Sequence, residues 1–394
     1  MQTNTAAVKD AKVKNSMKVK AAVVNGVNEK YEMEELTLSE LRADEVLVKV
    51  VATGICHSDE ALRIGDAEYP MPAVFGHEGA GIIEKVGSAV KDLAVGDQVV
   101  MAYDYCGTCP SCRTGHPSSC KDWTPINFGS PRSDGTYIFT KADGTPVSNF
   151  FNQSSFSTYT ITYANNLIKV DSETDLRLVG PLGCGLLTGF GTIVNGLKPE
   201  TNSSIAIFGT GAVGLGALMT AKIEGCSPII AIDIHDSRLE RAKELGATHT
   251  INSRVENLEE RIAEITGGIG VNYSIDTTGI SSVMKSSLDI LTIGGSTVPL
   301  AVTPNSLEFN PFTELTLNNR KVVGVLMGDA VPQLAIPKLI QYHKEGKFPF
   351  DKLVKFYKFD EINEASEDSN SGKTIKPILI IDEDYRKDEP VMES

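Results

Sequence analysis

The sequence predicts an α/β fold built from two parts, a mostly β, barrel-like lobe and a doubly wound parallel sheet. In the first half of the chain, short β-branched segments alternate with glycine, proline and other turn residues, a pattern typical of antiparallel strands. From about residue 186, short apolar segments alternate with helical ones, which is the pattern of a parallel sheet covered by helices. The length of 394 residues is enough for two domains.

The composition is that of a folded globular protein, with 41% hydrophobic and 22% charged residues. The net charge of −14 leaves no basic face for a phosphate backbone, so nucleic acid is not an expected partner. Apolar runs such as 227–232 are far shorter than the roughly 18 residues that span a bilayer, so no membrane segment is expected. Residues 1–16 are polar and show no targeting signal, so we expect a flexible leader on a cytoplasmic protein.

Four strands are expected in the β lobe. The region that follows them, to about residue 168, is rich in glycine, proline, serine, threonine and aromatic residues, so we expect long functional loops there. The four strands cover 19–24, 45–51, 80–87 and 96–102. The end of the chain is expected to hold a helix at 332–344, a β-rich segment at 353–381 and a charged, frayed tail at 382–394.

The parallel sheet is expected to begin with a strand at 204–208, followed by a glycine-rich turn and a helix at 215–224. The next pair is a strand at 229–232 and a helix at 236–246 with an acidic start and a glycine stop. Three more strands are expected at 272–275, 296–301 and 322–326.

Four of the seven cysteines lie within fifteen positions, at Cys106, Cys109, Cys112 and Cys120. In a chain without a secretion signal this spacing favours a tetrahedral structural zinc over disulfides. Chance clustering of buried thiols is one alternative, and a zinc ribbon that binds nucleic acid is another, although the acidic composition counts against it. His116 lies within the loop but is expected to face solvent, since four thiolates already complete the site.

The turn after the strand at 204–208 has the spacing Gly209-x-Gly211-x-x-Gly214, and Asp233 follows at the end of the next strand. Such glycines let backbone N–H groups approach a pyrophosphate at the start of a helix. The acid would accept hydrogen bonds from ribose hydroxyls and repel a 2′-phosphate, which predicts NAD rather than NADP. A turn without a ligand and the similar turn of a methyltransferase are alternatives.

A second set of metal-binding side chains includes Cys56 and His77, with Ser58, Asp59 and Glu78 close by in the sequence. A catalytic zinc takes three protein ligands and keeps one position open.

The third ligand is expected to be Cys184, which would place the metal over the cofactor cleft, just before the dinucleotide-binding part begins. A lone cysteine at that position would more often be a small buried hydrophobe.

The chain from about 17 to 381 resembles the zinc-dependent medium-chain alcohol dehydrogenases. The resemblance is carried by Gly76-His77-Glu78-x2-Gly81-x5-Gly87-x2-Val90, the four-cysteine loop, Gly183-Cys184-Gly185 with Thr188-Gly189, and the glycine turn with its acid. Within this family the chain is most similar to the aryl (benzyl) alcohol dehydrogenases, through the segments 152–156, 180–185 and 347–357.

The resemblance implies a GroES-like catalytic domain, formed by 17–185 and 327–394, around a Rossmann domain at 186–326. It implies two zinc ions, a catalytic one on Cys56, His77 and Cys184 and a structural one on the four-cysteine loop. Members form dimers and tetramers, and we expect a homotetramer.

By the same resemblance, residues around the metal and the cofactor receive roles. Asp59 would orient the His77 ring, and the Glu78 carboxylate would approach the metal during ligand exchange. His57 would lie near the cofactor pyrophosphate, Arg238 near the adenosine ribose and Thr188 against the nicotinamide.

The implied reaction is hydride transfer from an alcohol to NAD, with zinc as the Lewis acid. Ser58 would pass the alcohol proton to the ribose hydroxyls. Ala61 stands where family members often have a relay histidine, so the proton would leave through water or through His57.

The expected substrates are primary aromatic or allylic alcohols. Tyr103, Trp123 and Phe128 are candidates for the substrate pocket, with a core position as the equal alternative. Short aliphatic alcohols are a second possibility, and a non-catalytic NAD-binding scaffold with only a structural zinc is a third. No functional role is expected for the three lone histidines, His235, His249 and His343, which are expected at the surface, or for Cys226, which is expected in the core.

Overall fold

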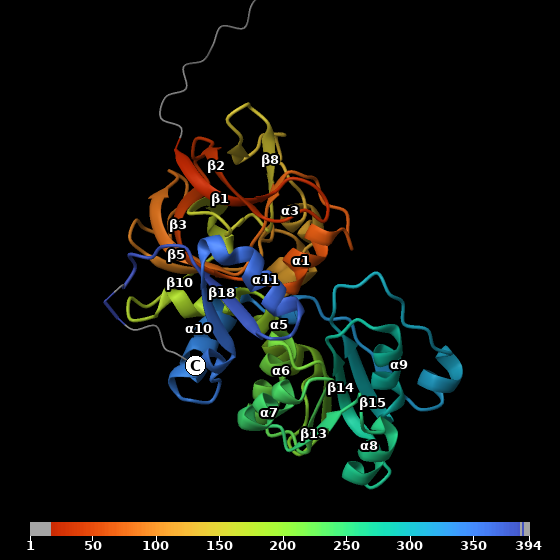
Figure 1. Ribbon diagram of the computed structural model, residues 1–394. Helices are drawn as coiled ribbons and strands as arrows, with labels where there is room; N and C mark the ends of the chain where they lie inside the picture. The colour runs from red at the N-terminus through yellow and green to blue at the C-terminus, as the bar shows by residue number, and fades with distance from the viewer. Residues whose placement is uncertain (1–16, 387, 390–394) are drawn as a thin grey trace, which may run out of the picture.

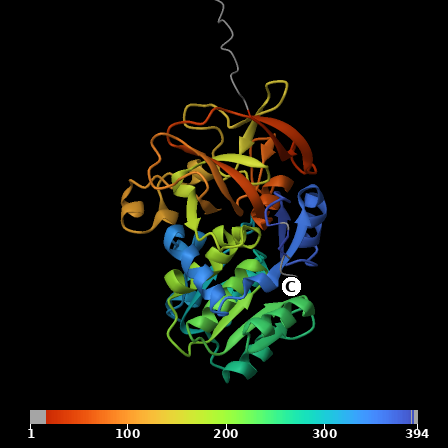
Figure 2. The ribbon, with the colours of Figure 1, turned by 90° about the vertical axis from the view of Figure 1, so that its left-hand side faces the viewer.

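The computed structural model describes residues 17–386 and 388–389, so the expected leader at 1–16 lies outside the described residues. The predicted α/β fold is confirmed: a β lobe, which the ends of the chain form together, lies beside a parallel sheet with its helices (Figures 1 and 2).

Five short strands of the β lobe form a closed barrel in the order β1-β2-β7-β8-β4. They are β1 Lys18–Val24, β2 Glu32–Leu38, β7 Phe139–Thr140, β8 Pro146–Asn149 and β4 Ala73–Val74. Six further strands form a sheet in the order β10-β6-β5-β3-β18-β17, and β9 pairs with β3 beside this path. They are β10 Leu167–Val170, β6 Gln98–Met101, β5 Gly79–Val86, β3 Glu45–Gly54, β18 Lys376–Ile380 and β17 Val354–Lys358, with β9 at Tyr159–Tyr163.

The central strand β3 is buried along almost its whole length because β5, β9 and β18 all pair with it. A Cβ at Gly81 would lie 2.3 Å from the carbonyl oxygen of Lys49, so only glycine allows β5 to pack this closely against β3. Since β18 comes from the end of the chain, the C-terminal segment completes the sheet that carries the first metal-binding stretch.

The other sheet is entirely parallel, in the order β13-β12-β11-β14-β15-β16. Its strands are β11 Ile205–Phe208, β12 Ile229–Asp233, β13 His249–Asn252, β14 Val271–Asp276, β15 Leu291–Pro299 and β16 Lys321–Val322. The helices between them are α6 Ala212–Ile223, α7 Asp236–Leu245, α8 Leu258–Thr266 and α9 Ser281–Asp289. This strand order is that of a Rossmann sheet, in which ligands bind where the order reverses, at β11.

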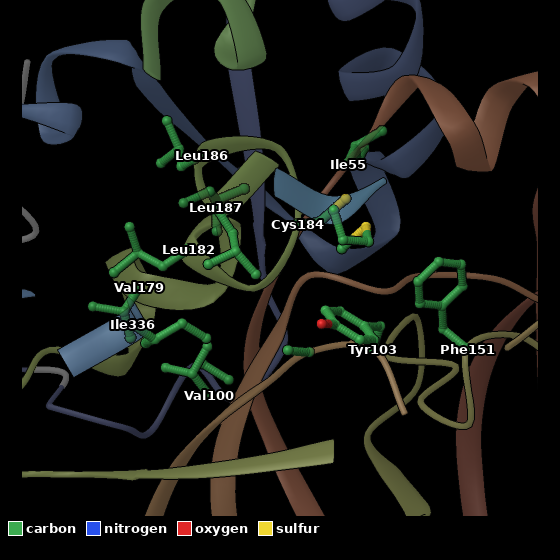
Figure 3. Close-up of a cluster of buried hydrophobic side chains, with 14 of the residues drawn as sticks. Ile55, Val100, Tyr103, Phe151, Val179, Leu182, Cys184, Leu186, Leu187 and Ile336 are labelled. Carbon is green, nitrogen blue, oxygen red and sulfur yellow. The ribbon is translucent and has the colours of Figure 1, made fainter. Parts of the chain in front are cut away.

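Helical segments join the two parts. They are α4 Leu176–Val179, η3 Gly180–Gly183, α5 Gly185–Gly191, η4 Thr192–Leu197, η6 Met327–Asp329 and α10 Pro332–Lys344. Cys184 belongs to the apolar cluster at this junction, together with Ile55, Tyr103 and Phe151 (Figure 3). In the described part of the chain no single helix is long and apolar enough to cross a membrane; one bent pair, Leu176–Gly183 with Gly185–Leu197, meets that test by length and composition alone.

Several expectations about single elements were wrong. The strand expected at 322–326 is reduced to Lys321–Val322, and β15 begins five residues earlier than expected. The segment at 353–381 contains a helix, α11 Ile362–Asn370, which buries Ile362, Ala365, Ser366 and Asp368. The β lobe also contains the helix α1, His57–Ile64, directly after β3.

The described part of the tail is packed rather than frayed. Asp382 forms an ion pair of 2.6 Å with Lys49, and the hydroxyl of Tyr385 accepts a hydrogen bond from the backbone N–H of Leu176. The remaining tail positions, 387 and 390–394, lie outside the described residues.

Candidate active site

A single buried carboxylate ties the two metal-binding stretches together. Asp59, in the first turn of α1, accepts hydrogen bonds from the backbone N–H of Cys56 at 3.1 Å and of Gly76 at 3.0 Å. Its Oδ1 also lies 2.9 Å from Nδ1 of His77. Because this contact places the ring proton on Nδ1, Nε2 of His77 is left free to bind a metal.

The three predicted ligands converge at one point. Sγ of Cys184, which joins η3 to α5, lies 3.1 Å from Nε2 of His77 and 4.0 Å from Sγ of Cys56. All three ligand atoms lie within 4.8 Å of one another. Two thiolates on a tetrahedral zinc, with Zn–S bonds of about 2.3 Å, are separated by about 3.8 Å. The arrangement therefore fits a zinc ion with one open position.

The environment favours a thiolate at Cys56. Its hydrogen bond with the Cys184 thiol, helped by the charges of His77 and Lys376, lowers the pKa of Cys56 well below the usual value despite burial. A thiolate is the form of cysteine that binds metals.

Lys376 is a residue of this site that the sequence analysis missed. It lies in β18, is 3% exposed, and its Nζ donates to both carboxylate oxygens of Glu78, at 2.9 and 2.8 Å, and to the carbonyl oxygen of Ile55 at 3.0 Å. Burial raises the pKa of Glu78 to about 7, against the opposing effect of the Lys376 charge. A Cβ at Gly54 would lie 2.1 Å from Oε2 of Glu78, so glycine at 54 makes room for this pair.

Aromatic side chains form a wall behind the histidine ligand. The ring of His77 lies 4.8 Å from that of Phe151 and 5.2 Å from that of Phe150. Trp123 and Phe128 contact the ring of Phe151 in turn, at 5.7 and 5.5 Å. Trp123 and Phe128, two of the three candidate pocket residues, are thus connected to the metal site through Phe151, a residue that the sequence did not single out.

Tyr103 is a core residue, which is the alternative given beside its candidate place in the substrate pocket. Its side chain is fully buried and its hydroxyl donates to the carbonyl oxygen of Ala330. Burial raises the pKa of this hydroxyl well above its usual value.

A cavity of about 660 Å³ runs from the metal ligands to the end of β12. Cys56, His57 and Gly185 line one end, and the glycine turn and Asp233 line the other. A Cβ at Gly211 would meet nothing within 4 Å, so the backbone at the start of α6 is open to a ligand. This cradle at a helix N-terminus fits a pyrophosphate.

The other two glycines have steric roles in the turn. Gly209 has a φ of +85°, which favours glycine, and a Cβ there would lie 2.4 Å from Oγ1 of Thr277. A Cβ at Gly214 would lie 2.0 Å from the carbonyl oxygen of Gly209, so this position lets α6 pack against β11.

The residues expected on the proton path are only partly brought together. His57 is exposed and lines the cavity, and Oγ of Ser58 lies 3.8 Å from Sγ of Cys56. Ala61 is fully buried, so this position on α1 belongs to the core. Thr188, which is expected against the nicotinamide and not on the proton path, lies on α5 with its hydroxyl 4.0 Å from Sδ of Met327.

The lone histidines differ from one another. His235 lines the cavity together with Arg238, so the expectation that it is a surface residue without a functional role is wrong. His343 is half-buried against the ring of Phe350, at 4.6 Å, so it too is not a simple surface residue, whereas His249 is exposed as expected. Cys226 is in the core as expected, and burial raises the pKa of its thiol to about 11.

The four sulfurs of the cysteine loop lie within 4.8 Å of one another, which fits a closed tetrahedral zinc site. Sγ of Cys106 and Cys112 are 4.0 Å apart, and those of Cys109 and Cys112 are 3.4 Å apart. The backbone N–H groups of Cys106 and Cys109 donate to Sγ of Cys120 and of Cys106, which stabilises the thiolate form. The His116 side chain is 56% exposed, as expected, and pairs with Asp329.

Two family models match parts of the chain. The family model "Alcohol dehydrogenase GroES-like domain" matches residues 42–172, and the model "Zinc-binding dehydrogenase" matches 212–343. The geraniol dehydrogenase of Castellaniella defragrans is 40% identical over 364 residues, which cover 91% of this chain and 97% of that protein.

Two solved structures are similar over nearly the whole fold. The benzyl alcohol dehydrogenase of Acinetobacter calcoaceticus has a TM-score of 0.88 at 44% identity and covers 92% of this chain and 99% of its own. An alcohol dehydrogenase zinc-binding domain protein from Burkholderia ambifaria has a TM-score of 0.89 at 46% identity, with coverage of 93% and 99%.

Proposed function

Because the chain belongs to the zinc-dependent medium-chain alcohol dehydrogenase family, we propose that it reversibly oxidises primary aromatic or allylic alcohols to aldehydes with NAD. The observation that carries this proposal is the position of the three-ligand site. Cys56 is both a candidate ligand and part of the lining of the cavity that ends at Asp233. A hydride donor at the metal would therefore lie next to the nicotinamide end of a bound dinucleotide.

We assign the catalytic zinc to Cys56, His77 and Cys184, and the structural zinc to the four-cysteine loop. When bound, the catalytic zinc supplies Lewis-acid stabilisation of an alkoxide. The chain itself fixes the His77 ring through Asp59 and holds Glu78 against Lys376.

Ser58 accepts the alcohol proton in this proposal because its hydroxyl is close to the ligand Cys56. His57, exposed in the cavity, carries the proton on toward solvent. It takes the part of the relay histidine that other family members often have at the position of Ala61. Gly209, Gly211 and Gly214 form the pyrophosphate turn, Thr188 contacts the nicotinamide, and Arg238 and Asp233 bind at the adenosine ribose.

The proposed substrate class is supported by two observations. Phe151 places an aromatic ring against His77, where a flat or unsaturated substrate would gain contact area. The similar proteins include a geraniol dehydrogenase and a benzyl alcohol dehydrogenase. Short aliphatic alcohols are the second candidate, because the same family chemistry requires only a primary hydroxyl group.

Metal analysis combined with a substrate panel tests the proposal. Two zinc ions per chain, with benzyl and cinnamyl alcohols preferred over ethanol and a polyol, are expected. A single zinc that disappears in Cys106→Ser would contradict the catalytic site and favour the scaffold alternative. Preference for ethanol would select the aliphatic alternative.

We also propose that the domain boundaries fall near 186 and 326 and that copies of the chain associate into a homotetramer. Support for association comes from large apolar side chains exposed along the outer edge of the parallel sheet, Ile293, Phe312 and Leu317. Light scattering tests this assembly, and Phe312→Asp with Leu317→Asp is expected to reduce the mass of the particle.

A further inference from the structure

The segment Met327–Asp329 has an unusual backbone. Its three residues all lie in the left-handed region, with φ of +49° at Met327, +69° at Gly328 and +44° at Asp329. Glycine adopts this conformation freely, whereas residues with a side chain do so rarely and persist there when their surroundings hold them. Neighbouring groups must therefore keep Met327 and Asp329 in place.

The carboxylate of Asp329 ties this segment to the cysteine loop. Its Oδ2 lies 2.8 Å from Nδ1 of His116, and its Oδ1 accepts a hydrogen bond of 2.9 Å from the hydroxyl of Ser118. Both partners lie between the candidate zinc ligands Cys112 and Cys120. A closed metal site on these ligands would fix the two groups that hold Asp329.

Other side chains fix the main chain around Asp329. Nδ2 of Asn195 donates to the carbonyl oxygens of Gly328 and Asp329, at 3.0 Å each. The hydroxyl of Tyr103 donates to the carbonyl oxygen of Ala330. The segment is thus held from the junction between the two parts as well as from the cysteine loop.

The same segment packs directly on α5, which follows the candidate ligand Cys184. A Cβ at Gly191 would lie 2.1 Å from the carbonyl oxygen of Gly328, so the two backbones touch and a shift of one displaces the other. Sδ of Met327 lies 4.0 Å from Oγ1 of Thr188. Thr188 is the residue that we place against the nicotinamide.

We propose that Asp329 is a positioning residue that couples the cysteine loop to the nicotinamide end of the cofactor site. The inference rests on the proposed NAD-linked function, in which Thr188 contacts the nicotinamide. The carboxylate holds the left-handed segment against α5 and so sets the position of Met327 beside Thr188. The cysteine loop thereby acts on cofactor binding although none of the residues 106–120, all of which the structure describes, lines the cofactor cavity.

Two ligands separate an effect at the nicotinamide from a general loss of binding. NADH carries the nicotinamide, whereas ADP-ribose has the same adenosine and pyrophosphate without it. Both dissociation constants are measured on the zinc-loaded full chain, NADH by nicotinamide fluorescence and ADP-ribose by calorimetry. Thermal unfolding and zinc content show whether each variant is folded and loaded.

The variants remove the contact in steps. Asp329→Ala removes both hydrogen bonds and leaves the left-handed conformation to a residue that disfavours it. Asp329→Asn keeps an acceptor for Ser118 and tolerates that conformation, so it tests the proposal even if the alanine variant does not fold. The matched control is Asp351→Ala, because the Asp351 side chain is also 28% exposed, also pairs with a histidine, His343, and does not line the cavity.

We expect Asp329→Ala to weaken NADH by about tenfold and ADP-ribose by less than about twofold, because the displaced segment disturbs only the nicotinamide end. Asp329→Asn should weaken NADH by about threefold, with ADP-ribose unchanged, since it loses only the charged contact with His116. The loop variant His116→Gln with Ser118→Ala should also weaken NADH, and it should add little to Asp329→Ala, because both remove the same contact.

Three results would overturn the proposal. They are an equal loss of NADH and ADP-ribose in the Asp329 variants, a change no larger than that of Asp351→Ala, and full additivity of the loop variant with Asp329→Ala. Absence of NADH binding in the unaltered protein would contradict the proposed function itself, and the inference would fall with it. The two failures are distinguishable because the first three results require an unaltered protein that binds NADH.

Discussion

Replacing Lys376 by methionine is expected to destabilise the β lobe more than any surface lysine change would. Lys376 and Glu78 form a buried ion pair at 2.8 Å, with side-chain exposures of 4% and 0%. Methionine has a similar length and keeps the packing of the stem, but it removes the cation that opposes the raised pKa of Glu78, so the acid must either stay charged and buried or take up a proton. The substitution therefore isolates the electrostatic part of the contact.

The magnitude follows from the cost of an uncompensated buried charge. Removing one partner of such a pair costs about 3–5 kcal/mol, whereas replacing both partners by neutral groups is often close to neutral. Burial alone lowers the pKa of Lys376, but the charges of Glu78 and Cys56 raise it above its usual value, so the ammonium stays charged. The double variant Lys376→Met with Glu78→Gln should accordingly recover about 2 kcal/mol or more of the loss.

Chemical unfolding of the zinc-loaded protein, followed by the fluorescence of Trp123, measures these effects. Trp123 is the single tryptophan of the chain and its ring contacts Phe151, which packs on His77. The matched control is Lys373→Met, whose lysine side chain is 63% exposed and pairs with Asp368, and which should cost less than about 1 kcal/mol. Equal effects of Lys376→Met and Lys373→Met, or a double variant as unstable as the single one, would refute the reasoning.

Three further predictions concern the metals and the substrate. Cys184→Ala should remove one zinc per chain and lower kcat by at least about a thousandfold while leaving NADH binding within about threefold, because only the open metal site is lost; retained turnover with two zinc ions would show that another group is the third ligand. Cys106→Ser should remove the other zinc and lower the unfolding temperature, since a structural zinc contributes directly to folding; an unchanged metal content would contradict the four-cysteine site. Phe151→Ala should raise KM for benzyl alcohol by about tenfold and leave that for ethanol nearly unchanged, since an aromatic contact of about 1.5 kcal/mol is lost; equal changes for both alcohols would remove Phe151 from the substrate pocket.

The parallel sheet and the metal-binding residues were predictable because their signals are local in the sequence. The glycine turn and Asp233 follow successive strands, and the cysteine loop supplies four ligands from fifteen positions. Cys184 needed a combination of motifs, since a lone cysteine resembles a core residue.

Other features depend on contacts that no local pattern encodes. Lys376 lies 298 positions from Glu78, so their pairing appears only when the last strand joins the sheet. His235 lines the cavity together with Ser369 and Asn370, which lie far from it in the sequence. The helix α11 was missed because its segment is short and mostly polar and lies between two strands.

The C-terminal strand belongs to the active site although it supplies no metal ligand. β18 pairs with β3 so that Ile378 lies opposite Gly54, and the backbone N–H of Ile55 donates to the carbonyl oxygen of Pro377. This register brings Nζ of Lys376 to both the Ile55 carbonyl and the Glu78 carboxylate, beside the ligands Cys56 and His77. The pairing of β18 with β3 therefore also places the cation that offsets the buried Glu78 beside the metal ligands.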